Sequence, residues 1–238
     1  METNVCFTES SSGKSRECAI ITHWMWGSIE NQSLLMIRDA FVDSNISVYS
    51  FDLFWHGHSQ GDIQDMTLSK CYEQAIQIIR RCRDEWYNKI YLYGTSVSSL
   101  PILKAWIEEK VNKVLLKSPI IDYYEKRLVD LWKEKMELWK KENSIVLPDK
   151  LWMTEWTIMK YDFVADYLEK FEDIFVKNST IKCFICSGNN DEEVPIEKLE
   201  KLVRENTYYK LNILDETHKF SKDWISEFIV NSLNFIKN

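Results

Sequence analysis

The sequence predicts an α/β protein in which helices flank a mainly parallel central sheet, with one helical insertion. Two observations lead to this prediction: short apolar runs alternate with longer segments of helical periodicity, and the runs are apolar on both strand faces. Strands buried on both faces are typical of parallel sheets covered by helices. The length of 238 residues suits a single core. We therefore expect one domain over residues 1–238.

The expected strands are short runs rich in β-branched and aromatic residues, which favour the extended backbone. An edge strand is expected first, at residues 5–8. Six further strands are expected at residues 18–23, 46–52, 89–94, 114–118, 181–187 and 209–214. In a parallel sheet of this kind, ligands bind at the carboxyl ends of the strands, so the residues just after these runs are candidates for a site.

The expected helices lie between these strands and place apolar residues at the spacing of one helix face. They cover residues 31–43, 68–87, 98–109, 196–205 and 221–236. The alternation stops over residues 120–178, where no convincing strand occurs and the sequence is helix-like and rich in tryptophan. We expect this stretch to form a helical cap over the sheet.

Charge and composition exclude several classes of protein. The formal net charge is −7 and the basic residues are interleaved with acids, which argues against a nucleic-acid partner. No apolar run reaches the roughly 18 residues of a membrane span, and the first residues contain no apolar signal-peptide core. We therefore expect a cytoplasmic protein without a membrane span, while the sequence leaves its oligomeric state open.

Six cysteines occur in the chain, and without a secretion signal we expect reduced thiols. Cys183 and Cys186 form a C-x-x-C pattern inside a strand-like run. Residues three apart on a strand point to opposite faces. The pattern therefore favours core packing over a shared metal or redox site.

A strand-to-helix turn at Ser96 is the strongest candidate for chemistry. The segment Gly94-Thr95-Ser96-Val97-Ser98 follows an apolar run and precedes a helical pattern. A tight turn of this kind exposes a serine hydroxyl where nearby backbone N–H groups can stabilise a developing oxyanion. A plain glycine turn is the alternative for this segment alone, so the interpretation depends on partner residues.

This segment resembles the nucleophile elbow G-x-S-x-G of the α/β-hydrolase family, with Ser98 in place of the last glycine. Residues 187–195 resemble the family's acid loop, G-x-x-D-x-x-V-P. Residues 215–220 are similar to the loop that holds the family's histidine before its final helix. The resemblance implies Ser96 as nucleophile, Asp191 as the acid and His218 as the general base, in the family's order along the chain.

Two upstream segments resemble the same family. Residues 20–27 occupy the position of its H-G-x-x-G loop, which implies the backbone N–H groups of Met25 and Val97 as donors of an oxyanion hole. Residues 51–59 resemble its D-x-R-G-H-G-x-S segment and form the most extensive single match. The resemblance as a whole spans residues 18–236.

Both upstream segments depart from the family pattern in the same direction. Trp24 and Trp55 stand where the family has glycines. A tryptophan is costly at positive φ, so we expect either extended backbone at both positions or loops that have shifted. His23 and His56 in these segments are interpreted as structural residues.

The resemblance implies acyl transfer to water through an acyl-enzyme, on a carboxylic ester or thioester. The expected partner is a small-molecule acyl substrate with an apolar or aromatic part. No organic cofactor and no metal are implied. The expected substrate-binding residues are Trp24, Trp152 and Trp156. Residues expected to border the pocket at the next strand end are Lys117, Ser118 and Asp122.

Several alternatives stay open at this point. Glu192 or Glu193 can substitute as the acid, and a non-hydrolytic acyltransferase or cyclase would keep Ser96 while excluding water. The altered glycines are also compatible with a catalytically impaired binding protein. A triad does not distinguish carboxylesterases from thioesterases or C–C hydrolases. For Trp132 and Trp139 in the cap, packing against the body of the protein is as good an explanation as lining the pocket.

Overall fold

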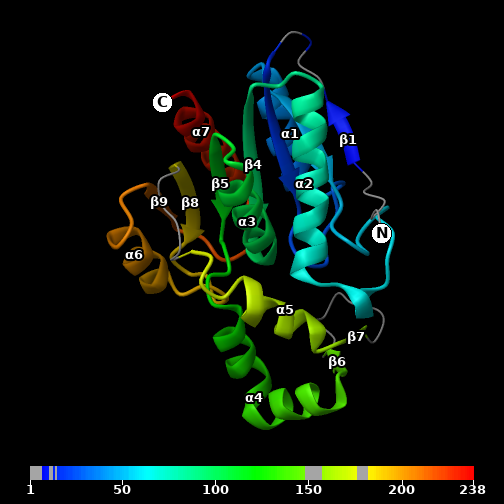
Figure 1. Ribbon diagram of the computed structural model, residues 1–238. Helices are drawn as coiled ribbons and strands as arrows, with labels where there is room; N and C mark the ends of the chain where they lie inside the picture. The colour runs from blue at the N-terminus through cyan, green and yellow to red at the C-terminus, as the bar shows by residue number, and fades with distance from the viewer. Residues whose placement is uncertain (1–6, 11–12, 14, 148–156, 176–181) are drawn as a thin grey trace.

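The computed structural model describes residues 7–10, 13, 15–147, 157–175 and 182–238. In these residues seven strands form one sheet, in the order β1-β3-β2-β4-β5-β8-β9. β1 runs antiparallel to β3, and the other neighbouring pairs are parallel (Figure 1). The strands are β1 (Phe7–Ser10), β2 (Glu17–Thr22), β3 (Ser47–Phe51), β4 (Lys89–Thr95), β5 (Lys113–Lys117), β8 (Lys182–Gly188) and β9 (Tyr209–Leu214). The predicted α/β class with a mainly parallel sheet is confirmed.

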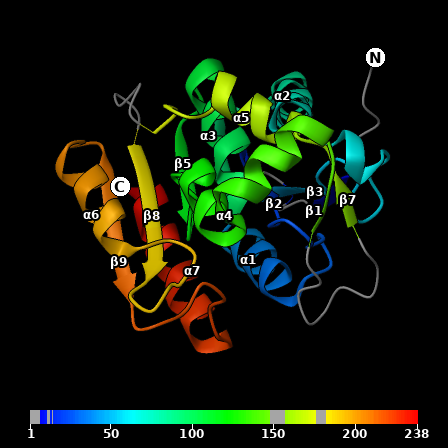
Figure 2. The same cartoon turned by 90° about the horizontal axis from the view of Figure 1, so that it is seen from below.

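Helices cover both faces of this sheet (Figure 2). On one face lie α1 (Gln32–Asp43) and α7 (Lys222–Lys237); on the other lie α2 (Leu68–Asp84), α3 (Ser99–Glu109) and α6 (Ile196–Arg204). Cys183 and Cys186 are both buried and belong to the apolar clusters on opposite faces. Their predicted role in core packing is confirmed. None of the helices in the described ranges is both long and apolar enough to cross a membrane.

The expected elements agree with the observed ones to within one residue at most ends. The edge strand β1 extends to Ser10, two residues beyond its expected end, and residues 5 and 6 lie outside the described part of the chain. α2 ends at Asp84, although the sequence pattern continues to residue 87. Trp86 has a φ of 70°, in the left-handed region where an α-helix cannot continue. A backbone conformation, not a change in apolar pattern, ends this helix.

Between β5 and β8 the chain forms a separate layer at one end of the sheet (Figure 1). It comprises α4 (Tyr123–Glu142), the antiparallel pair β6 (Ile145–Leu147) and β7 (Thr157–Met159), and α5 (Asp162–Lys170). The expectation of a purely helical stretch is therefore wrong. Strands of three residues are too short to show alternation in a sequence. α4 is itself broken at Trp132, whose φ of 62° and ψ of 153° are not helical.

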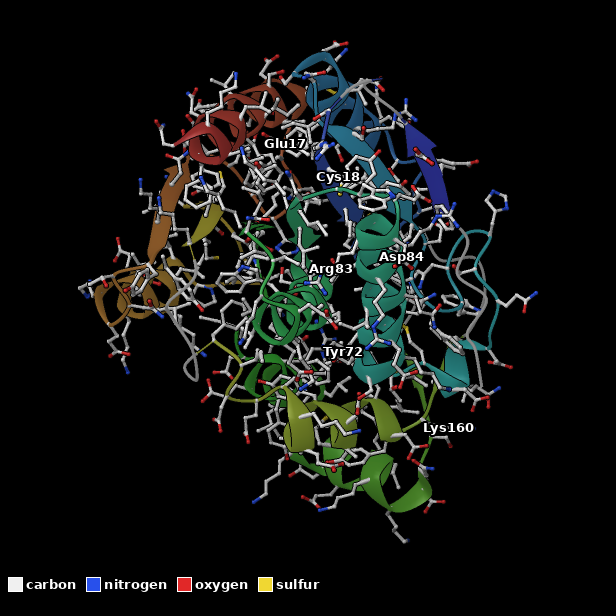
Figure 3. All side chains as sticks on the ribbon, turned by 45° about the horizontal axis from the view of Figure 1, so that its top comes forward. Glu17, Cys18, Tyr72, Arg83, Asp84 and Lys160 are labelled. Carbon is white, nitrogen blue, oxygen red and sulfur yellow. The ribbon has the colours of Figure 1, made fainter. Side chains whose placement is uncertain are left out.

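Polar contacts fasten this layer to the body of the protein. Asp166 of α5 is buried and accepts hydrogen bonds from the backbone N–H (2.7 Å) and the hydroxyl (2.5 Å) of Ser69, in the first turn of α2. A carboxylate at that end of a helix also complements the helix dipole. Lys160, which is labelled in Figure 3, follows β7, and its Nζ lies 2.5 Å from Oδ1 of Asp65 in η1 (Ile63–Asp65). Trp139 is fully buried and donates to a β7 carbonyl (2.9 Å), so its ring packs inside the layer.

Candidate active site

Ser96 lies where the central strand β4 passes into η2 (Ser96–Ser98) and then α3. β4 pairs with β2 and β5, and the direction of strand progression reverses between β2 and β4. Open parallel sheets bind ligands at the carboxyl ends of strands at such a reversal. The φ of Ser96 is 54°, a conformation that a residue with a side chain rarely adopts. Such strain concentrates at functional turns.

Gly94 and Ser98 explain how this turn closes. A Cβ added at Gly94 would lie 3.1 Å from the backbone oxygen of Ser98, so a larger residue would displace the turn. The buried Ser98 hydroxyl accepts a hydrogen bond from Thr95 N–H (2.9 Å) and donates one to Thr95 O (2.8 Å). The serine that replaces the family's last glycine therefore caps the turn with its own side chain.

Asp191 follows β8 in residues 189–195, which we call the acid loop. Its carboxylate is buried, and Oδ1 accepts hydrogen bonds from the N–H groups of Glu193 (2.9 Å) and Val194 (3.0 Å). Burial by itself raises the pKa of Asp191, but hydrogen bonds from His218 and these two N–H groups outweigh it, and the pKa lies below its ordinary value. Asp191 is thus an anion held in one orientation.

His218 follows β9 in residues 215–221, which we call the histidine loop. Its Nδ1 lies 2.9 Å from Asp191 Oδ2, and its Nε2 lies 3.0 Å from Ser96 Oγ. When Nδ1–H donates to the carboxylate, Nε2 is the acceptor for the serine hydroxyl. The structure therefore brings the three predicted residues, from three separate strand ends, into one hydrogen-bonded chain.

The acid loop and the histidine loop touch through their backbones. Asn190 N–H donates to Glu216 O (2.9 Å), and Asn189 N–H donates to Leu214 O (2.8 Å). A Cβ added at Gly188 would lie only 1.9 Å from Glu216 O. The absence of a side chain at Gly188 is what allows the two loops to approach this closely.

A buried lysine supports the histidine loop. Lys117 is the last residue of β5 and is 5% exposed. Its Nζ donates to the backbone oxygen of His218 (3.0 Å) and lies 4.1 Å from the centroid of the Phe220 ring. Burial lowers the pKa of Lys117 to about 8, against the opposing influence of nearby acidic groups, namely Asp191, Cys186 and Glu216. The sequence placed Lys117 at a strand end, but no local pattern signals its contact with a loop about a hundred residues away.

A cavity of about 180 Å³ lies between the start of α4, the acid loop and α6. Ile120 and Val194 contribute apolar walls, and Ile120 N–H donates to the backbone oxygen of Ser96 (3.3 Å). At the charged rim, Lys198 Nζ lies 2.7 Å from Asp122 Oδ2. Ile120 thus links the cavity wall to the Ser96 backbone, whereas Ser96, Asp191 and His218 are not among the residues that line the cavity.

Two buried histidines hold the loop that follows β2. His23 Nε2 accepts from Leu53 N–H (3.1 Å), and His23 Nδ1 lies 2.7 Å from Trp24 O. His56 Nε2 accepts from Trp26 N–H (2.9 Å). Burial is the main reason that the pKa of His56 falls to about 3, so this ring is neutral near pH 7. These contacts match the structural role predicted for both histidines.

At Trp55 the backbone is not extended, so the first of the two expected alternatives does not hold there. Its φ is 72°, in the left-handed region that favours glycine. Its ring packs edge-on against the rings of Trp26 (5.5 Å between centroids) and His56 (4.9 Å). Aromatic contacts of this kind offset part of the backbone strain. Trp24 lies outside the positive-φ region, which Trp26 enters instead with a φ of 69°.

The structure describes some of the other predicted site residues but not all of them. Met25 and Val97 lie on the loops after the neighbouring strands β2 and β4; Met25 is half-buried and Val97 is buried. Trp24 is half-buried in the same loop as Met25. Trp152 and Trp156 lie outside the described residues. In the ranges that the structure describes, no group of three or more His, Cys, Asp or Glu side chains is placed to hold a metal ion.

The fold has solved counterparts that are distant in sequence. Est1E from Butyrivibrio proteoclasticus, in a structure with ferulic acid bound, matches with a TM-score of 0.83 at 19% identity, over 98% of this chain and 96% of that one. Alpha/beta hydrolase domain-containing protein 10 from mouse matches with a TM-score of 0.80 at 17% identity, over 99% of this chain and 94% of that one. An esterase from Pyrococcus furiosus matches with a TM-score of 0.70 at 18% identity, over 99% of this chain and 90% of that one. No protein-family model matches the sequence, and neither does any curated protein. The chain therefore has the α/β-hydrolase fold.

Proposed function

We propose that this protein is a serine hydrolase that cleaves carboxylic esters or thioesters through an acyl-enzyme. The observation that carries the proposal is the hydrogen-bonded chain: His218 Nε2 lies 3.0 Å from Ser96 Oγ, and His218 Nδ1 lies 2.9 Å from Asp191 Oδ2. A serine hydroxyl is a weak nucleophile, and an adjacent base oriented by a third group activates it. The names of two structural neighbours, an esterase and an alpha/beta hydrolase domain protein, support the same chemistry.

In this mechanism His218 removes the proton of Ser96 as the serine oxygen attacks the substrate carbonyl carbon. Asp191 keeps the imidazole in the tautomer with Nδ1 protonated and stabilises the imidazolium that forms. The backbone N–H groups of Met25 and Val97 donate to the oxyanion. His218 then protonates the leaving group. A water molecule, deprotonated by the same imidazole, attacks the acyl-enzyme and releases the acid.

We infer that the cavity whose wall residue Ile120 bonds to the Ser96 backbone receives a short or single-ring acyl group. Its volume of about 180 Å³ is similar to that of an apolar cavity of about 150 Å³ that holds one benzene molecule. Ile120 and Val194 supply apolar wall, while charged side chains lie at the rim. We assign the acyl group to this cavity and the role of a cap to residues 120–178. The residues proposed to contact the rest of the substrate are Trp24, Trp152 and Trp156.

Steady-state turnover of p-nitrophenyl esters and of thioesters with graded acyl groups tests the proposal. We expect the highest kcat/KM for acyl groups of up to about six carbons or for benzoyl, because these match the cavity. Ser96→Ala should abolish turnover while remaining folded. Adding an alcohol acceptor separates hydrolysis from acyl transfer, since a hydrolase releases the free acid as its main product. A folded protein that turns over none of these substrates would contradict the proposal and favour a catalytically impaired binding protein.

A further inference from the structure

Lys117 is a buried charge that the mechanism above does not use. It is 5% exposed at the carboxyl end of β5. A buried ammonium group destabilises the folded state unless it finds partners. Burial lowers the pKa of Lys117 to about 8, which shows that its partners compensate only part of this penalty. The buried side chain therefore lowers the stability of the folded state, which is typical of groups with a functional task.

The contacts of Lys117 are made with the histidine loop. Its Nζ donates to the backbone oxygen of His218 (3.0 Å), the residue whose imidazole bonds to Ser96. The same ammonium group lies 4.1 Å from the centroid of the Phe220 ring, two residues further along the loop. Two points of attachment fix the loop backbone, and the backbone sets the direction in which the imidazole projects.

We propose that Lys117 is a positioning residue whose ammonium group holds the histidine loop so that the His218 imidazole stays in line between Asp191 and Ser96. This inference rests on the proposed function, because it takes His218 as the base. The imidazole must keep hydrogen bonds of 2.9 Å and 3.0 Å at its two nitrogens. A displacement of about 1 Å is enough to lower turnover about a hundredfold. Lys117 acts through the backbone of His218 and not on the substrate.

The other end of β5 offers a matched control. Lys113 is four residues before Lys117 and so lies on the same face of the sheet. Its Nζ donates to the backbone oxygens of Phe235 (2.8 Å) and Ile236 (2.9 Å) and lies 5.2 Å from the centroid of the Phe235 ring. These are the same kinds of contact, made with the end of α7 instead of the histidine loop. A general effect of removing a β5 lysine will therefore appear in variants at both positions.

The experiment compares steady-state hydrolysis of p-nitrophenyl acetate by Lys117→Met, Lys117→Arg and Lys113→Met, with active enzyme counted by fluorophosphonate titration. We expect Lys117→Met to lower kcat about tenfold to a hundredfold with KM changed less than about twofold, because the substrate contacts are intact. Lys117→Arg keeps the charge and the donor and should recover most of kcat. Lys113→Met should keep the wild-type kcat.

Three outcomes would overturn the positioning role: a wild-type kcat in Lys117→Met, an equal loss in Lys113→Met, or no recovery in Lys117→Arg. If Lys117→Met lacks a cooperative thermal transition, Phe220→Leu takes its place, because it removes only the ring contact. That variant should lose part of kcat at unchanged KM, and a wild-type kcat would count against the proposal. A wild-type protein that hydrolyses no ester would contradict the proposed function instead, so the two failures are distinguishable.

Discussion

Replacing Gly188 with alanine tests the backbone contact that joins the acid loop to the histidine loop. The added Cβ would lie 1.9 Å from Glu216 O and 2.5 Å from its carbonyl carbon, whereas at least 3.0 Å is needed, a shift of about 1.1 Å. Both are backbone atoms, so no side-chain rotation can relieve the overlap. Asp191 lies three residues after Gly188, and His218 lies two residues after Glu216. Pushing the two loops apart therefore lengthens the hydrogen bond between Asp191 and His218.

We expect Gly188→Ala to lower the free energy of unfolding by about 1–3 kcal/mol, the range for overpacked sites. For a chain of this length that corresponds to a fall in Tm of about 2–12 °C. A misplacement of about 1 Å should also lower kcat roughly a hundredfold, measured by ester hydrolysis. Gly13→Ala is the control for backbone strain without a steric clash: its φ of 87° disfavours a side chain, but a Cβ added there meets no atom within 4 Å, so we expect a lower Tm with a wild-type kcat. A wild-type kcat in folded Gly188→Ala would refute the reasoning that this contact sets the geometry of the acid and the base.

Three further predictions concern titratable side chains. Asp191→Asn should lower kcat on the order of 10⁴-fold with little change in KM, and a larger loss on altering either neighbouring glutamate would identify a different acid. Burial lowers the pKa of Lys117 from 10.5 to about 8, so between these pH values the unfolded state binds more protons. The free energy of unfolding, measured in urea, should therefore rise with pH by roughly 3 kcal/mol relative to Lys117→Met, and equal slopes would contradict the shift. The pKa of His56 is lowered from 6.5 to about 3, so the free energy of unfolding should fall by up to roughly 5 kcal/mol as pH drops through this window. His56→Asn should lose this pH dependence, whereas His58→Asn, at an exposed position, should keep it. An unchanged pH dependence in His56→Asn would disprove the assignment.

The order of the elements and the three triad candidates could be predicted because their signals are local. Apolar runs define the strands, and each candidate closely follows one of them: Ser96 comes directly after β4, Asp191 three residues after β8, and His218 four residues after β9. Parallel pairing then brings all three to the same edge of the sheet. The capping role of Ser98 is equally local, since its side chain bonds to a residue three positions away.

Features that depend on contacts between distant segments could not be predicted in the same way. The positive φ of Trp55 is accompanied by packing against Trp26, which lies on a different loop. The contact of Lys117 with the His218 carbonyl joins residues 101 positions apart. The β6–β7 pair was missed for another reason, since three residues per strand carry too little periodicity to be told from the surrounding helical pattern.

Covalent labelling of Ser96 by a fluorophosphonate, followed by intact-mass measurement and peptide mapping, tests the proposed nucleophile most directly. We predict a single adduct per chain on the tryptic peptide of residues 90–104, assigned to Ser96 by fragmentation. Ser98 and Ser99 share this peptide but are buried, so they serve as internal controls. Ser96→Ala should stay folded and unlabelled. A folded wild-type protein that takes up no label, or an adduct that persists in Ser96→Ala, would contradict the assignment.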